Sequence, residues 1–123
     1  MVKLMEMDER VSVRTRMQEE SGAPVVLINK FNVPPEGVEQ FLQTWQADAA
    51  FLKAQPGYIS AQLHRGISGS CTFVNIAVWE SVDAFRRAFS QPEFQAKMAV
   101  YPEGVLASPH LFRKIAVPGI CVA

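Results

Sequence analysis

The stretch that decides the fold is TFVNIAVWES, residues 72–81. Because side chains alternate between the two faces of a β-strand, one face receives three β-branched residues, Val74, Ile76 and Val78. The other face receives a mixed set of Phe73, Asn75, Ala77 and Trp79. Apolar residues on both faces predict a strand that is buried on both sides. Ser81 can cap a helix, so a helix is expected to begin directly after this strand.

The mixed face of this strand has two interpretations. An amide between an aromatic ring and an alanine, with the Trp79 indole further along, is typical of a cavity wall. A structural role fits the same residues, because Asn75 can bridge backbone groups and the Trp79 N–H can donate to a carbonyl. The stretch by itself leaves both interpretations open.

Length and charge limit the class of protein. The 123 residues are enough for one domain with a sizeable core, and twelve basic residues balance twelve acidic ones. This balance argues against nucleic-acid binding. Cys71 and Cys121 have no metal-ligand spacing and are expected to be free thiols. Since neither chain end reads as a signal sequence or a membrane span, we expect a soluble, cytoplasmic protein.

The other elements follow from hydrophobic periodicity. A first strand is expected at residues 25–33, with Asn29 interrupting an apolar row. An amphipathic helix over residues 38–52 carries Phe41 and Trp45 on its apolar face; Trp45 fits either the core or a ligand contact. A second strand at 58–65 and a Gly/Ser-rich turn at 66–70 predict a hairpin with the strand at 72–79. Helices are expected at 81–90 and from Pro92 to Tyr101, then a loop at 102–109 and a last strand at 111–117.

The element order is therefore β-α-β-β-α-β. This order predicts an α+β, ferredoxin-like antiparallel sheet of four strands with two helices on one face. The domain is expected at residues 24–117, after an extension at 1–23 with a short strand at 11–17 outside the core, and before a tail at 118–123. The first and third strands are expected side by side and parallel, so that Asn29, Asn75 and Trp79 face one space under the helices.

The face of the sheet away from the helices is also apolar. A face of this kind, several hundred square ångströms in order of magnitude, is not left to water by a stable monomer. A second copy of the same sheet is the expected cover, giving a two-fold homodimer with a barrel-like interior. The apolar tail, residues 120–123, is available to wrap onto the partner.

Several of these residues resemble the antibiotic biosynthesis monooxygenase domains of the dimeric α/β-barrel superfamily. The resemblance covers residues 24–117 and rests on Asn29, on the Gln-Pro-Gly-Tyr of residues 55–58, and on Asn75-x-x-x-Trp79 followed by Ser81. Phe41, Trp45 and Phe85 extend it. It implies a homodimeric enzyme that oxidises an anthrone- or quinol-like aromatic with dioxygen and needs no cofactor or metal. It further implies Asn29, Asn75 and Trp79 as catalytic residues. The expected substrate-binding residues are the aromatics Phe31, Phe41, Trp45, Phe73 and Phe85.

The implied chemistry agrees with the residue types. A deprotonated hydroquinone or anthrone can reduce dioxygen itself, so the protein must bind a flat ring, stabilise its anion and exclude water. Amide N–H groups and an indole suit these tasks, and the sequence has no glycine-rich dinucleotide loop, phosphate loop or His/Cys cluster of metal spacing.

Two alternatives remain. A sister branch of the family degrades haem and shares the positions of Asn29 and Trp79, but it also uses a histidine on the second helix, and residues 81–101 contain none. The chain could instead be a non-catalytic dimeric protein that binds a small hydrophobic ligand. His64 and His110 lie at predicted strand ends, where a histidine is usually structural or solvent-facing, and are not assigned to catalysis.

Overall fold

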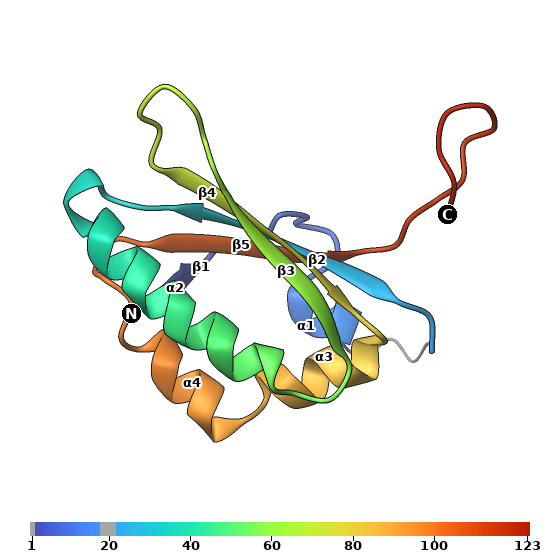
Figure 1. Cartoon of the computed structure of the whole chain (residues 1–123), viewed down its shortest axis with the longest axis horizontal. Coiled ribbons are helices and arrows are strands. Elements are labelled where there is room, and N and C mark those ends of the chain that lie inside the picture. Colours follow the sequence, from blue (N-terminus) through green and yellow to red (C-terminus); the bar gives the residue numbers. More distant parts are fainter. Residues whose placement is uncertain (1, 18–21) are drawn as a thin grey trace.

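A computed structural model describes residues 2–17 and 22–123 of the chain, and the strands in these residues form one sheet of five strands in the order β1-β5-β2-β4-β3. The strands are β1 (Lys3–Leu4), β2 (Val25–Asn32), β3 (Tyr58–Arg65), β4 (Thr72–Trp79) and β5 (Leu106–Phe112). The helices are α1 (Val13–Met17), the short 3-10 helix η1 (Pro35–Gly37), α2 (Val38–Lys53), α3 (Val82–Phe89) and α4 (Pro92–Met98). Figure 1 shows α2, α3 and α4 on one face of the sheet. The predicted α+β, ferredoxin-like class is confirmed.

The two asparagines lie on neighbouring strands. In the pairing of β2 with β4, Asn29 stands directly opposite Asn75, and Phe31 opposite Phe73. The predicted adjacency is confirmed, but the predicted parallel direction is wrong, because β2 and β4 are antiparallel. The cause is the chain path. Helix α2 returns the chain so that β3 runs in the same direction as β2, and the hairpin between β3 and β4 then reverses it.

The last strand lies earlier in the sequence than predicted. β5 runs from Leu106 to Phe112 and includes Pro109, whereas residues 102–109 were expected to be a loop and 111–117 a strand. The carbonyls of Val105 and Ala107 accept bonds from Lys3 and Met5, so odd-numbered residues of β5 direct their backbone groups toward β1. Because β1 ends at Leu4, the missing N–H of Pro109 removes no bond from the sheet.

The N-terminal extension takes part in the fold. Val2 is buried in the core, and β1 pairs in parallel with β5. The predicted strand at residues 11–17 is wrong, because Val13–Met17 is helical and Ser12 caps it: its Oγ accepts from the N–H of Thr15 at 3.2 Å. Residues 18–21, in the predicted extension, lie outside the described part of the chain.

Local residues determine where α3 begins and how closely the start of β3 approaches it. The Ser81 Oγ accepts a hydrogen bond from the Ala84 N–H at 3.1 Å, which is the predicted N-cap. Gly57, before β3, has a φ of +88°, and a Cβ there would lie 2.4 Å from the Ala84 Cβ. Only glycine satisfies both the left-handed backbone and this close approach.

The core under the helices has two clusters. One, at the α3 end, contains Trp79 and Phe85; the other, at the opposite end, contains Phe31, Phe41 and Phe73. Between the two clusters lie Asn29 and Asn75, which belong to neither. The packing is therefore interrupted where the polar residues stand.

The other face of the sheet carries apolar side chains that none of the helices in residues 2–17 and 22–123 covers. Val26, Ile28, Val74 and Val78 are partly exposed there, and Ile76 is 39% exposed. Residues 113–123 extend away from the sheet (Figure 1) and leave Ile120 and Val122 more than 80% exposed. We call the set Val26, Ile28, Val74, Ile76 and Val78 the open face.

Candidate active site

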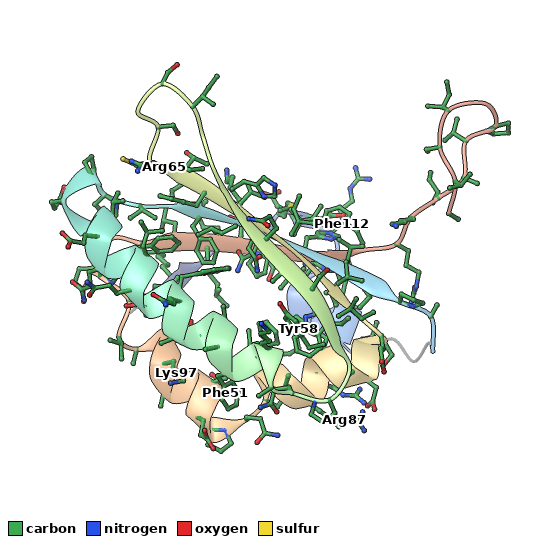
Figure 2. The ribbon with its side chains drawn as sticks, viewed as in Figure 1. Phe51, Tyr58, Arg65, Arg87, Lys97 and Phe112 are labelled. Atoms are coloured by element: carbon green, nitrogen blue, oxygen red, sulfur yellow. The ribbon has the colours of Figure 1, made fainter. Side chains whose placement is uncertain are left out.

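A cavity lies between the sheet and helices α2, α3 and α4. It has an inner chamber of about 50 Å³ and an adjacent outer chamber of about 450 Å³. Six residues line both chambers: Asn29, Phe31, Asp48, Phe89, Phe94 and Tyr101. The inner chamber also includes Asn75 and Trp79, and the outer chamber reaches Arg14 and Arg86. Figure 2 shows Tyr58, another inner-chamber residue, on the helix side of the sheet and Phe112 on the opposite side.

The two amides line this cavity, and the oxygen of each has no hydrogen-bond partner. Asn75 is 9% exposed, and the Oδ1 atoms of Asn29 and Asn75 are buried with no hydrogen-bond partner. A buried acceptor left unsatisfied costs about 1–3 kcal/mol. The alternative in which Asn75 bridges backbone groups through this oxygen is therefore not what the structure contains.

A third unpartnered oxygen belongs to Asp48. Within residues 2–17 and 22–123, the buried side-chain oxygens without a hydrogen-bond partner are those of Asn29, Asn75 and Asp48. All three residues line the inner chamber. Unsatisfied groups are rare in folded proteins, so their concentration in one cavity indicates a site for a ligand with hydrogen-bonding groups.

Trp79 forms the end of the inner chamber nearest α3. Its side chain is 1% exposed and packs edge-on against Tyr58 at 5.6 Å and against Phe85 at 6.2 Å, measured between ring centroids. The residue is thus a core aromatic and a wall of the chamber at once. The two interpretations of this side chain drawn from the sequence are compatible.

The five predicted substrate-binding aromatics separate into two groups. Phe31 and Trp45 line the inner chamber, and Phe31 and Phe85 line the outer one. Phe41 and Phe73 line neither; they are 0% and 2% exposed, and their ring centroids lie 4.9 Å apart. These two rings pack behind the chamber wall, and they hold Phe31 in place rather than face the cavity.

Asp48 and Tyr101 form a buried pair that was not predicted from the sequence. The Tyr101 hydroxyl donates to the Asp48 Oδ2 at 2.6 Å, and both side chains are buried. Burial raises the pKa of Asp48 above its ordinary value, while the hydrogen bond from Tyr101 and the charge of Lys97 oppose that change. Burial, followed by the nearby Asp48 charge, raises the pKa of Tyr101.

A signal for Asp48 was present in the sequence. It stands on the apolar stripe of α2, three residues after Trp45 and four before Leu52, where an amphipathic helix normally places a hydrophobic residue. An acidic side chain on such a stripe needs a partner, and Tyr101 supplies it from the segment after α4.

The histidines and cysteines lie elsewhere. His64 is exposed on β3. His110 pairs with Ile28, so it lies on the face of the sheet away from the cavity, 3.9 Å from the Asp8 carboxylate; neither histidine lines the two chambers. Cys71 and Cys121 are free thiols, as predicted. In the described residues, no group of three or more His, Cys, Asp or Glu could hold a metal ion. No helix among them is long and apolar enough to cross a membrane; the cytoplasmic location stays a prediction.

Residues 24–100 match the family described as antibiotic biosynthesis monooxygenase, and the chain belongs to this family. The predicted resemblance is thereby confirmed. The chain is 41% identical over 70 residues to deoxynogalonate monooxygenase of Streptomyces nogalater, an alignment that spans 57% of this chain and 58% of that protein. The match thus covers less than two thirds of that relative's length.

Solved structures agree with this family. The crystal structure of SnoaB, a cofactor-independent oxygenase from Streptomyces nogalater, superimposes with a TM-score of 0.69 and 31% identity, covering 79% of this chain and 98% of that one. A Shewanella loihica protein, described as a candidate monooxygenase, gives a TM-score of 0.68 and 34% identity over 80% of this chain and all of its own.

Proposed function

We propose that the protein is a cofactor-independent monooxygenase that oxidises a flat, electron-rich phenolic compound of the anthrone or hydroquinone type with dioxygen. The observation that carries this proposal is the meeting of three unpartnered oxygens, on Asn29, Asn75 and Asp48, in a cavity with aromatic walls. Family membership and the oxygenase named among the structural relatives support the reaction class.

The chemistry requires the protein to favour an anion. An anthrone that loses a proton becomes an electron-rich anion that dioxygen can oxidise directly. One oxygen atom then becomes the new carbonyl of the quinone, and the other leaves as water with the two hydrogens of the reacting CH₂ group. In this scheme Asn29 and Asn75 hold the substrate oxygen through amide N–H groups, since a side-chain amide can present either its oxygen or its nitrogen. Trp79 supplies a flat wall.

Chamber size suggests how the reactants divide the space. A dry cavity of about 150 Å³ is enough for one benzene molecule, and ligand sites are roughly 300–1,000 Å³. The outer chamber, at about 450 Å³, has room for fused rings, whereas the inner chamber, at about 50 Å³, has room only for dioxygen or for one edge of a ring. In the proposed arrangement the rings lie against Phe31 and Phe85, with the reacting edge toward Asn75 and Trp79.

We also propose that two copies pair through their open faces as a homodimer. The supporting observations are the partly exposed apolar row on β2 and β4 and the extended apolar tail with its exposed Ile120 and Val122. Burying both in a two-fold interface would remove an uncovered surface that is unusual for a monomer.

Oxygen uptake tests the proposed activity. Chelator-treated protein is mixed with 1,8-dihydroxyanthrone or a hydroquinone, and the rate is compared with uncatalysed oxidation. We expect acceleration that is lost in Asn75→Ala and retained in Gln46→Ala, a matched amide exposed on α2. Acceleration that appears only after haem is added, with a shifted Soret band, would favour the haem alternative.

Binding can be followed separately from turnover. The chain has two tryptophans, Trp45 and Trp79, and both line the inner chamber, so tryptophan fluorescence reports on this cavity. A hydroxyanthraquinone, which resembles the product, should quench it with one site per chain. Quenching without any acceleration of oxygen uptake across the panel would contradict the oxygenase and leave a binding protein.

A further inference from the structure

We propose that Asp48 is the base that takes the proton from the substrate and that Tyr101 is the residue that positions it. This inference rests on the proposed function, which leaves open what removes the proton. The two amides can stabilise an anion, but a neutral amide does not accept a proton at ordinary pH. Some other group at the cavity must do so.

Asp48 is placed for this role by its environment. It lines both chambers, at the place where the outer and inner parts of the cavity adjoin, and it is 4% exposed. Its Oδ2 accepts from the Tyr101 hydroxyl at 2.6 Å, and its Oδ1 has no partner. One carboxylate oxygen is therefore fixed, and the other is left to bind a donor on a ligand.

Tyr101 is itself held firmly. Its ring lies 6.3 Å from Phe31, with the planes nearly parallel, and 5.7 Å from Phe41. Both contacts lie in the core cluster that contains Phe31, Phe41 and Phe73. Because Tyr101 is 6% exposed and packed on two sides, its hydroxyl fixes the orientation of the Asp48 carboxylate.

The charges around Asp48 leave it available as a base. The other titratable residues lining the chambers are Tyr58, Tyr101, Arg14 and Arg86, and Lys97 acts on Asp48 from α4. Arg86 pairs with Asp83, and Lys97 is half-buried on α4, where its charge lowers the pKa of Asp48 by less than burial raises it. A carboxylate with an ordinary pKa is a weak base toward a phenol of pKa about 10. Burial raises the pKa of Asp48, which brings it closer to the pKa of the phenol and makes the carboxylate a stronger base.

The proton moves from the substrate to Asp48 and is later returned. An acidic O–H or C–H bond of the substrate breaks, its electron pair stays on the aromatic system, and the proton bonds to the Asp48 Oδ1. Asp48 becomes neutral in the same step, so no negative charge remains beside the new anion. The proton is returned later, when one atom of dioxygen leaves as water, and the carboxylate is restored.

Substitutions at position 48 test the assignment. Asp48→Asn keeps the shape but removes the base, and we expect kcat to fall by a factor of about 10²–10⁴. The control Glu39→Gln makes the same change at an exposed site on α2 and should leave kcat unchanged. Hydroxyanthraquinone binding by Asp48→Asn, followed by tryptophan fluorescence, should stay within about threefold of the unaltered protein.

Two further measurements show whether Asp48 acts as a base or only stabilises the fold. Added formate should restore part of the activity of Asp48→Ala, with a rate that rises with formate concentration, because a small carboxylate can enter the space that the side chain vacates. Tyr101→Phe removes a bond that lowers the Asp48 pKa, so the acidic limb of the pH profile of kcat/KM should move to higher pH.

The outcomes are distinguishable from failure of the proposed function. If the unaltered protein fails to accelerate oxygen uptake, the oxygenase proposal itself is wrong. If it is active, the assignment of Asp48 is overturned when Asp48→Asn, folded by circular dichroism, keeps kcat within about threefold. It is also overturned when formate fails to restore folded Asp48→Ala and the acidic limb does not move in Tyr101→Phe.

Discussion

The two faces of the sheet are built from the same strands but have opposite character. On the face under the helices, β2 and β4 place Asn29 and Asn75 side by side, and their buried oxygens are left without partners in the cavity. On the open face, the same strands place Ile28 opposite Ile76 without a helix to cover them. The face under the helices thus has polar side chains at a buried position, whereas the open face has apolar side chains at partly exposed positions.

This difference assigns a separate task to each face. Buried, unsatisfied amides reduce stability and are retained where a ligand satisfies them. Exposed apolar side chains in a row are retained where another protein surface covers them. Alternation along a single strand therefore lets eight residues serve both a cavity and an interface.

The largest expected effect is at the open face. Ile76→Lys would bury two ammonium groups at a two-fold interface, and an unpaired buried charge costs several kcal/mol. We expect dimer affinity to fall by a factor of about 10³, measured by light scattering over a concentration series. Ile67→Lys, at an 87% exposed loop position, is the matched control and should stay dimeric. A monomeric unaltered protein at micromolar concentration would show that the open face is not an interface.

The second effect concerns the covered face. Asn75→Leu replaces an amide that lacks a partner with an apolar group of similar size, so the free energy of unfolding should stay the same or rise by about 1 kcal/mol. Phe41→Ala, on α2 in the cluster packed against the same face, should lose about 3–5 kcal/mol of the free energy of unfolding. Urea denaturation measures both. A comparable loss in Asn75→Leu would mean that the amide serves the fold and not a ligand.

The smallest effect is a pH dependence of stability. Burial raises the pKa of Asp48 above its ordinary value of 3.8, so the folded state binds this proton more tightly than the unfolded state. The contribution to stability is therefore complete below pH 3.8 and is lost as the pH rises through the folded-state pKa. As the pH rises, the free energy of unfolding of Asp48→Asn should increase relative to that of the unaltered protein. Urea denaturation from pH 3.5 to 8 measures this difference. An unchanged difference across that range would contradict the raised pKa.

Strong local patterns were sufficient to predict most of the fold. The alternation at residues 72–79, the cap at Ser81 and the stripe of α2 each depend on neighbouring residues, and all three were predicted. The errors arose where distant residues decide. Pro109 ends a strand by local rules, yet it is tolerated because β1 stops before reaching it.

The site was predictable to the same degree. Period-two alternation placed Asn29 and Asn75 on one face, and the register brought them together. Asp48 and Tyr101 are 53 residues apart in the sequence, and their contact depends on how α4 packs beside α2. No local pattern in a single sequence reveals a contact between two such distant residues. The acidic residue on the apolar stripe of α2 indicated only that Asp48 needs a buried partner.

The most direct test of the account is the fate of isotopically labelled dioxygen. Chelator-treated protein is given 1,8-dihydroxyanthrone under ¹⁸O₂, and the quinone is analysed by mass spectrometry with uncatalysed oxidation as the reference. We expect the quinone formed above the uncatalysed rate to carry one labelled oxygen atom without accumulation of hydrogen peroxide, and Asn75→Leu to form no quinone above that rate. Label-free quinone, or hydrogen peroxide formed in equal amount to the quinone, would contradict a monooxygenase at this cavity.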